Sequence, residues 1–251
     1  MRLDVYLYES GLVASRTEAK GFISSGAVTV NGNVVTKPAY NVTPDDDSVA
    51  VDKSSKRYVS RGGLKLEAAL TAFSIDPTGA KAIDIGASSG GFTDCLLKFG
   101  AEHVVAIDSG TAQLSQSLRD NYSVTSIENY NARFMKPEDL PYVPDLAVMD
   151  VSFISATYII PAIYNCLLPG GYFVCLIKPQ FEVGRSGVGK GGIVRDEKKR
   201  KEAVDNVIEI AYSYGLKNIQ TVVSPIKGGD GNTEFLAHFI LDSERRQDSE
   251  D

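Results

Sequence analysis

The chain has 251 residues, of which 43% are hydrophobic and 23% are charged, and its formal net charge is −6. This composition is ordinary for a globular protein, and the length suits one large domain with a small appendage. Three cysteines without metal-ligand spacing and only two histidines argue against a disulfide framework and against a metal site.

Residues 1–56 are expected to form a small ααβ domain. Apolar side chains within residues 2–9 predict a short helix, and Ser15 with Glu18 forms a capping box that opens a second helix ending near residue 24. Asn31 and Gly32 lie between two short apolar runs, a pattern typical of a β-hairpin.

Residues 57–63 are expected to be a linker, residues 64–242 a larger α/β domain and residues 243–251 a polar tail. A helix over residues 64–73 is followed by alternating strands and helices. The alternation predicts a doubly wound, mostly parallel seven-stranded sheet with helices on both faces. The expected strands are 82–86, 103–108, 123–128, 145–150, 172–178, 218–224 and 234–241, and the helices lie near 91–99, 111–119, 155–167 and 196–214.

An uncharged stretch over residues 151–177 is longer than the roughly 20 residues that span a bilayer. Pro161, Pro169, Gly170 and Gly171 interrupt it, so a buried helix, a turn and a central strand explain it better. The N-terminus lacks the apolar core and cleavage site of a signal peptide. We therefore expect a soluble, cytoplasmic protein with no membrane partner.

A glycine-rich turn over residues 84–93, DIGASSGGFT, follows the first strand of the larger domain. Ser88 occupies the middle glycine of the dinucleotide fingerprint, where a glycine lets the backbone approach a pyrophosphate. Asp108, at the end of the next strand, is well placed for ribose hydroxyls. This combination fits S-adenosylmethionine (SAM), which has a ribose but no phosphate, although the loop alone does not separate SAM from other nucleotides or from an unliganded turn.

A second glycine-rich stretch, GRSGVGKG over residues 184–191, nearly matches a phosphate-binding P-loop. Its last position, which should be Ser or Thr to hold Mg²⁺, is Gly191. We therefore expect a flexible lid over the substrate here and not a site for ATP or GTP hydrolysis.

Two of four candidate charged residues lie at the carboxyl ends of expected strands, where parallel sheets place their ligand crevice. Asp150 and Lys178 end neighbouring strands and Glu234 begins the last, whereas Lys65 lies in the helix before the first strand. A lysine in such a crevice can act as a general base or stabilise a developing alkoxide. Each residue taken alone could equally be a surface charge or a structural ion pair.

The glycine-rich turn, VMDVSF, IKPQF and NTEFLAHF together resemble the FtsJ-like ribose 2′-O-methyltransferases. Residues 1–56 resemble the RNA-binding domain of small-subunit ribosomal protein S-four. Joined through RYVSRGG, the two parts resemble the TlyA or haemolysin-A-like family of ribosomal RNA methyltransferases. The glycines between Arg61 and Lys65 depart from the family pattern, which we expect to affect linker flexibility more than chemistry.

The resemblance implies transfer of a methyl group from SAM to a ribose 2′-hydroxyl, of a cytidine, in ribosomal RNA or a ribosomal subunit. The family's catalytic tetrad falls on Lys65, Asp150, Lys178 and Glu234: Lys178 would act on the hydroxyl proton, Lys65 and Asp150 would orient the hydroxyl, and Glu234 would hold Lys178. The SAM site would comprise Asp84, Gly86, Ser88, Gly90, Gly91, Phe92, Asp108, Asn131 and Arg133. RNA phosphates would meet Arg16, Lys20 and Lys37.

Other functions are weighed against this interpretation. An RNA-binding module with an inactive methyltransferase domain would have no need of Asp150 and Lys178 together. A methyltransferase for small molecules or proteins would not need the N-terminal domain. A membrane-lytic haemolysin would need an amphipathic basic helix or an intact span, and the sequence offers neither.

Overall fold

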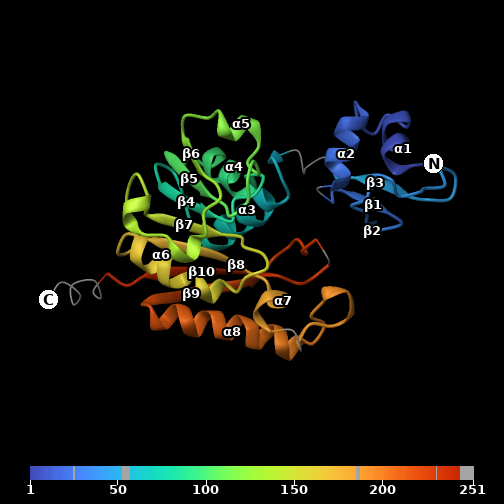
Figure 1. The fold of residues 1–251 in the computed structure, drawn as a ribbon. Coiled ribbons are helices and arrows are strands. Elements are labelled where there is room, and N and C mark those ends of the chain that lie inside the picture. The colour runs from blue at the N-terminus through green and yellow to red at the C-terminus, as the bar shows by residue number, and fades with distance from the viewer. Residues whose placement is uncertain (25, 53–56, 185–186, 230, 244–251) are drawn as a thin grey trace. The chain divides into compact units, whose positions relative to one another are not determined.

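The computed structural model describes residues 1–24, 26–52, 57–184, 187–229 and 231–243 (Figure 1). The chain divides into two compact units, Met1–Arg61 and Gly62–Asp251. Residues 53–56, at the end of the expected first domain, lie outside the described residues, and so does the expected tail beyond residue 243.

The N-terminal unit packs two helices against a small antiparallel sheet. Asn31 and Gly32 both have positive φ, 52° and 76°, as the hairpin turn between the first two strands requires. The third strand was not predicted from the sequence, and its pairing completes a sheet of order β2-β1-β3. The elements are α1 (Leu3–Glu9), α2 (Arg16–Ser24), β1 (Val28–Val30), β2 (Asn33–Val34) and β3 (Val49–Val51).

A buried carboxylate ties the first two helices together. Asp4 is fully buried and forms ion pairs of 2.9 Å with both Arg2 and Arg16. The hydrogen bond from Arg2, reinforced by Arg16, lowers the pKa of Asp4 to about 2. Arg16, expected to contact RNA, is therefore also a structural partner of Asp4, because removing it would leave a buried charge less well compensated.

The second unit is built on the seven strands that the sequence predicts, in the order β6-β5-β4-β7-β8-β10-β9. The strands from β4 to β8 pair in parallel, whereas β10 runs antiparallel to both β8 and β9. The doubly wound, mostly parallel sheet is confirmed. The strands are β4 (Lys81–Ile85), β5 (His103–Ile107), β6 (Val124–Ile127), β7 (Leu146–Met149), β8 (Tyr172–Ile177), β9 (Leu216–Val223) and β10 (Phe235–Leu241).

Helices cover both faces of this sheet (Figure 1). On one face α3 (Gly62–Phe73) and α4 (Gly91–Lys98) pack against each other and against the strands. On the other, α6 (Ile160–Cys166) and α8 (Glu197–Ser213) bury their apolar sides in the main core, where Ile163 and Val207 are fully buried. The central strands are apolar on both faces because both faces are covered.

Two local expectations are wrong. The helix expected over residues 111–119 is confined to α5 (Gln116–Arg119), because Ala112 has a positive φ of 52° and its N–H donates to Glu128. Gly62 and Gly63 belong to the first turn of α3 and not to a linker. A short helix that was not predicted, α7 (Pro179–Glu182), follows β8.

The uncharged stretch over residues 151–177 forms a 3₁₀ turn, η4 (Ala156–Tyr158), then α6, a turn and β8. Within the described residues, no helix is both long and apolar enough to cross a bilayer.

His238 is a buried titratable group on β10, only 5% exposed. Its ring stacks on Phe73 and meets Tyr172 edge-on, with ring centroids 5.5 Å apart in each pair. Burial lowers the pKa of His238 below its ordinary value of 6.5. The folded protein therefore holds this imidazole neutral, while the unfolded chain protonates it at the ordinary pKa.

We predict that the free energy of unfolding falls as the pH drops through 6.5 towards the lower pKa of folded His238, because the unfolded state binds more protons there. Above pH 6.5 neutral His238 no longer changes the free energy of unfolding with pH. His238→Phe keeps a ring between Phe73 and Tyr172, and its free energy of unfolding should lack this part of the decrease at low pH. Urea unfolding of both proteins at pH values on either side of 6.5 measures the difference, and identical pH dependences would contradict the prediction.

Candidate active site

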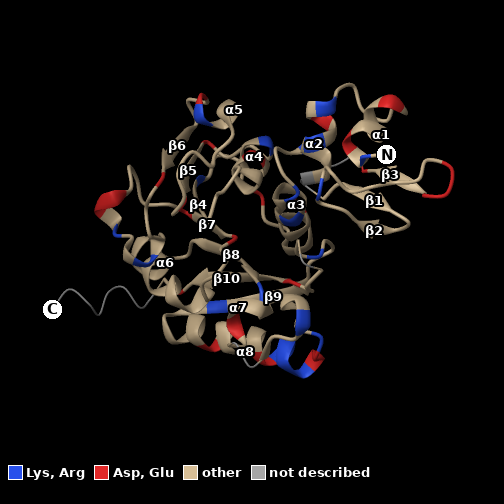
Figure 2. Cartoon of the chain, turned by 45° about the vertical axis from the view of Figure 1, so that its right-hand side comes forward, with Lys and Arg blue, Asp and Glu red and all other residues tan. Residues whose placement is uncertain are grey.

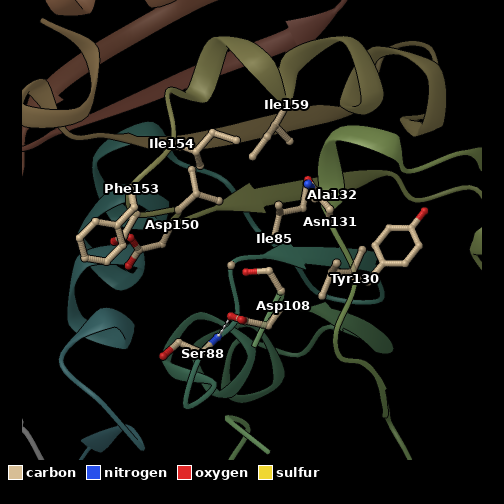
Figure 3. Close-up of a pocket in the computed structure, with 15 residues that line it drawn as sticks. Ile85, Ser88, Asp108, Tyr130, Asn131, Ala132, Asp150, Phe153, Ile154 and Ile159 are labelled. Atoms are coloured by element: carbon tan, nitrogen blue, oxygen red, sulfur yellow. Dashed lines mark hydrogen bonds between the residues drawn. The ribbon is translucent and has the colours of Figure 1, made fainter. Parts of the chain in front are cut away.

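A cavity of about 460 Å³ opens at the end of the sheet where the parallel strands terminate (Figure 3). It lies between β4 and β7, where the strand order reverses, which is the usual ligand position in doubly wound sheets. The volume is within the range of small-molecule sites. Five predicted site residues line it: Gly86, Ser88, Asp108, Asn131 and Asp150.

The turn after β4 is shaped to bring its backbone against β7. Gly86 has a φ of +81°, and a Cβ there would lie 2.5 Å from the backbone oxygen of Asp150. The carboxylate of Asp108 accepts a hydrogen bond of 2.7 Å from the N–H of Ser88 (Figure 3) and another of 2.7 Å from the N–H of Gly110. Asp108 is thereby fixed at the cavity wall by two backbone donors.

Asp84, a buried residue of β4, stabilises this turn but does not itself line the cavity. It is fully buried, and its Oδ2 accepts hydrogen bonds from the N–H and the hydroxyl of Thr93, at 2.9 and 2.6 Å. Burial, which outweighs these hydrogen bonds, raises the pKa of Asp84 to about 7. This carboxyl joins β4 to α4 and so holds the two ends of the turn together.

Four further residues expected at the SAM site are also absent from the cavity walls that the described residues form. Gly90 has a φ of +94°, but a Cβ there would run into the side chains of Leu118 and Leu114. Gly91 and Phe92 are buried in the first turn of α4. The guanidinium of Arg133 lies 4.8 Å from the ring centroid of Tyr158.

The remaining cavity walls were not predicted. Tyr130 and Ala132 follow β6, Ser109 follows β5, and Ser152 to Ile154 follow β7 (Figure 3). Burial, reinforced by a hydrogen bond to Asp139, raises the pKa of the Tyr130 hydroxyl to about 12. These residues could have been predicted from their position in loops that directly follow parallel strands, because such loops surround the ligand crevice.

The four charged residues form two ion pairs. Lys178 Nζ lies 2.6 Å from Asp150 Oδ1 and donates a hydrogen bond of 2.7 Å to the Ser152 hydroxyl. Lys65 Nζ donates to Glu234 Oε2 at 2.5 Å. The expectation that Glu234 holds Lys178 is therefore wrong, because the carboxylate of Glu234 pairs with Lys65 on α3.

Strand direction explains why these residues gather at one end of the sheet. Asp150 and Lys178 directly follow the parallel strands β7 and β8. Glu234 directly precedes β10, which is antiparallel to β8 with Phe235 opposite Ile177. The beginning of β10 therefore lies beside the end of β8.

Both lysines are largely buried, with side chains 11% exposed, while the side chains of Glu234 and Asp150 are 2% and 21% exposed. Ammonium and carboxylate groups are costly to remove from water, and each group here is compensated by a partner. Asp150 and Ser152 line the cavity, so the pair with Lys178 is the one that faces a bound ligand.

Phe153 stands at the mouth of the cavity, 93% exposed and with a positive φ of 65° (Figure 3). Its ring centroid is 5.3 Å from that of Phe181. A bulky residue with this backbone conformation is strained, and strain of this kind gathers at ligand sites. Phe153 thus offers an exposed aromatic surface, with half-buried Phe181 packed against it.

The glycine-rich stretch expected to form a lid lies partly outside the described residues, since residues 185 and 186 are not included. Its described part contains a 3₁₀ turn, η6 (Lys190–Gly192), and follows α7 instead of a strand. A P-loop requires a strand directly before it, so a site for ATP or GTP has no support in the fold. Among the described residues, no group of three or more His, Cys, Asp or Glu side chains could hold a metal ion.

Comparison with protein families gives two matches. Residues 58–240 match the FtsJ-like methyltransferase family, and residues 1–48 match the S4 domain.

Known proteins match over nearly the whole chain. "Hemolysin A" of Brachyspira hyodysenteriae is 46% identical over 96% of this chain and 100% of its own length. The "16S/23S rRNA (cytidine-2'-O)-methyltransferase TlyA" of Mycobacterium tuberculosis is 40% identical over 97% of this chain and 91% of its own length. A solved structure of a protein from Streptococcus thermophilus is 43% identical, with a TM-score of 0.77, and the match covers 96% of this chain and 88% of that protein's chain.

We predict that Asp108→Asn weakens the binding of SAM, the cofactor that the sequence indicates, by about tenfold or more. The amide would turn its NH₂ group towards one of the two backbone N–H groups, so one of the two hydrogen bonds that fix this side chain at the cavity wall would be lost together with its negative charge. Asp76→Asn is the matched control, because Asp76 also accepts from a backbone N–H, that of Thr78, in a turn outside the cavity walls. Calorimetry should separate the two variants, and equal SAM affinities would contradict the assignment of Asp108.

Proposed function

The chain belongs to the FtsJ-like methyltransferases with an N-terminal S4 domain, the family of TlyA and hemolysin A, and we propose that it methylates a ribose 2′-hydroxyl of ribosomal RNA. The family is SAM-dependent. The observation that carries the proposal for this chain is the contact of Lys178 with Asp150 and Ser152, two residues that line the cavity, with the Lys65–Glu234 pair at the same end of the sheet.

The cavity fits SAM in its size and in its walls. The turn at Gly86 leaves no room for a side chain beside Asp150, and Asp108 presents a carboxylate of fixed orientation to a ribose. Ser88 and Asn131 add polar groups, while Ile154 and Ile159 supply an apolar wall. Bound there, SAM supplies a methyl group on a positively charged sulfur.

The chain's own residues would prepare the hydroxyl. A free 2′-hydroxyl is a poor nucleophile, and Lys178, once it has released its own proton to solvent, is the group placed to take the hydroxyl proton as the methyl carbon bonds to oxygen and its bond to the sulfur of SAM breaks. Asp150, whose Oδ1 lies 2.6 Å from Lys178 Nζ, would stabilise the ammonium that Lys178 then becomes. Lys65, held by Glu234, would help to fix the hydroxyl in line for transfer, and such positioning supplies much of a rate enhancement.

The exposed ring of Phe153 beside the cavity supports a nucleotide as the substrate. This ring packs against half-buried Phe181, and bases stack on exposed rings of this kind. By likeness to the Mycobacterium tuberculosis enzyme, we propose a cytidine as the target, in small- or large-subunit rRNA or in the assembled subunits.

We predict that Lys178→Ala lowers the rate of methyl transfer to rRNA by about 10²–10⁴-fold, the usual contribution of a positioned acid–base group. Lys178→Arg should also fail, since a guanidinium does not lose its proton near neutral pH. SAM should still bind both variants. Lys217→Ala, at a surface ion pair with Asp242, is the control and should keep its rate.

Methyl transfer at close to the normal rate by a folded Lys178→Arg protein would remove the general-base role. Loss of SAM binding together with activity would instead place Lys178 in the cofactor site. Transfer assays on naked rRNA and on ribosomal subunits, with radiolabelled SAM, provide both the rate and the substrate.

The N-terminal unit is proposed to bind RNA phosphates through Lys20 and Lys37, which are exposed. Lys20→Ala/Lys37→Ala should weaken binding to different RNAs alike and lower the slope of log affinity against log salt by about 0.7–0.9 for each phosphate left without its lysine. Arg16→Ala is the poorer test because Arg16 also pairs with buried Asp4 and its loss should lower stability. An unchanged slope in the double lysine variant would move the RNA surface elsewhere.

A further inference from the structure

A strongly basic segment, residues 187–201, follows α7 and includes the first turns of α8. Six of its residues are basic and two are acidic, a local net charge of +4 in a chain whose net charge is −6. Figure 2 shows the basic positions gathered at one end of α8. The basic residues are Lys190, Arg195, Lys198, Lys199, Arg200 and Lys201.

The fold gains little from four of these charges. Lys198 and Lys201 form only exposed pairs with Glu202 and Asp205 on the same helix, and such pairs contribute little to stability. Lys190 and Arg195 are exposed, and neither is in an ion pair with any described residue. Cations in the first turns of a helix also oppose its dipole, which favours negative charge there.

The basic segment is nevertheless held firmly in place. Asn232 is 1% exposed, its Oδ1 accepts from Val194 N–H at 3.0 Å, and its Nδ2 donates to the Gly192 carbonyl at 2.8 Å. The next residue, Thr233, accepts a hydrogen bond of 3.3 Å from Arg200.

Glu234, the residue after Thr233, accepts from Lys65. Three consecutive residues before β10 therefore contact the glycine-rich part of the basic segment, the first turns of α8 and the tetrad. This places the basic segment at the same end of the sheet as the two ion pairs.

We propose that the basic segment is a phosphate-binding surface of the methyltransferase unit, which contacts the RNA backbone close to the nucleotide that enters the cavity. This inference rests on the proposed function and adds a second RNA contact to that of the N-terminal unit. Gly191 and Gly192 have positive φ and open space where a side chain would be, so a strand can approach the backbone beside Lys190. Asn232 acts as a positioning residue that keeps this surface beside the site.

The test uses Lys190→Ala/Arg195→Ala in the full chain, because neither residue belongs to the tetrad or to the contacts of Asn232 and Thr233. Lys81→Ala/Lys217→Ala is the matched control: it removes the same charge, and both residues lie at the start of strands, β4 and β9, at the opposite end of the sheet. Affinity for an rRNA fragment is measured by fluorescence anisotropy over a range of salt concentrations.

The Lys190/Arg195 variant should bind RNA several-fold more weakly than the control, with a salt slope lower by about 0.7–0.9 for each phosphate that is no longer neutralised. The affinity for SAM and the transfer rate at saturating RNA should be unchanged. Lys190→Glu/Arg195→Glu should bind RNA more weakly still than the alanine variant, because it adds repulsion.

RNA affinity and salt slope equal to those of the control would overturn the proposal. A second outcome would also overturn it: the variant binds vesicles of anionic phosphatidylglycerol more weakly than the control but binds RNA equally well. The basic segment would then bind a membrane surface and not RNA. Failure of the proposed function has a different signature: the unaltered protein would bind rRNA, with Lys190 and Arg195 contributing, yet transfer no methyl group.

Discussion

The antiparallel direction of β10 is the constraint on which the site depends. Parallel strands alone would bring Asp150 and Lys178 to one end of the sheet but would leave Glu234, at the start of its strand, at the other. Because β10 reverses, Glu234 lies beside the end of β8 and meets Lys65 from α3. The two ion pairs then lie at the same end of the sheet, and each largely buried lysine is neutralised by a carboxylate, which limits the cost of removing these charges from water.

The sheet could be predicted from the sequence because strands that are buried on both faces appear as short apolar runs. Strands β5, β7 and β8 are short, mostly apolar runs that are each followed directly by a charged residue, and all seven expected strands are present. Gly86 and Asp108 were found for the same reason, since the turn after the first strand and the end of the second meet the crevice wherever the sheet is doubly wound.

What the sequence did not predict depends on contacts between distant elements. Glu234 could have paired with either lysine, and only the packing of α3 decides for Lys65. Gly90 has the positive φ typical of a ligand loop, yet its missing side chain makes room for Leu118. The family resemblance therefore pointed to the four charged residues but not to their pairing, and the glycine pattern marked the turn but not which of its residues face the cavity.

The three residues before β10 contact both the basic segment and Lys65, which lie far apart in the sequence. Asn232 and Thr233 hold the basic segment, and Glu234 holds Lys65, so the proposed contact with RNA and the chemistry share one short stretch of backbone. A displacement of this stretch would move both the basic segment and the Lys65–Glu234 pair. Since a misplacement of about 1 Å can cost 10²-fold in rate, anchoring the segment with the nearly inaccessible amide of Asn232 suits a site where a large substrate must present one hydroxyl accurately.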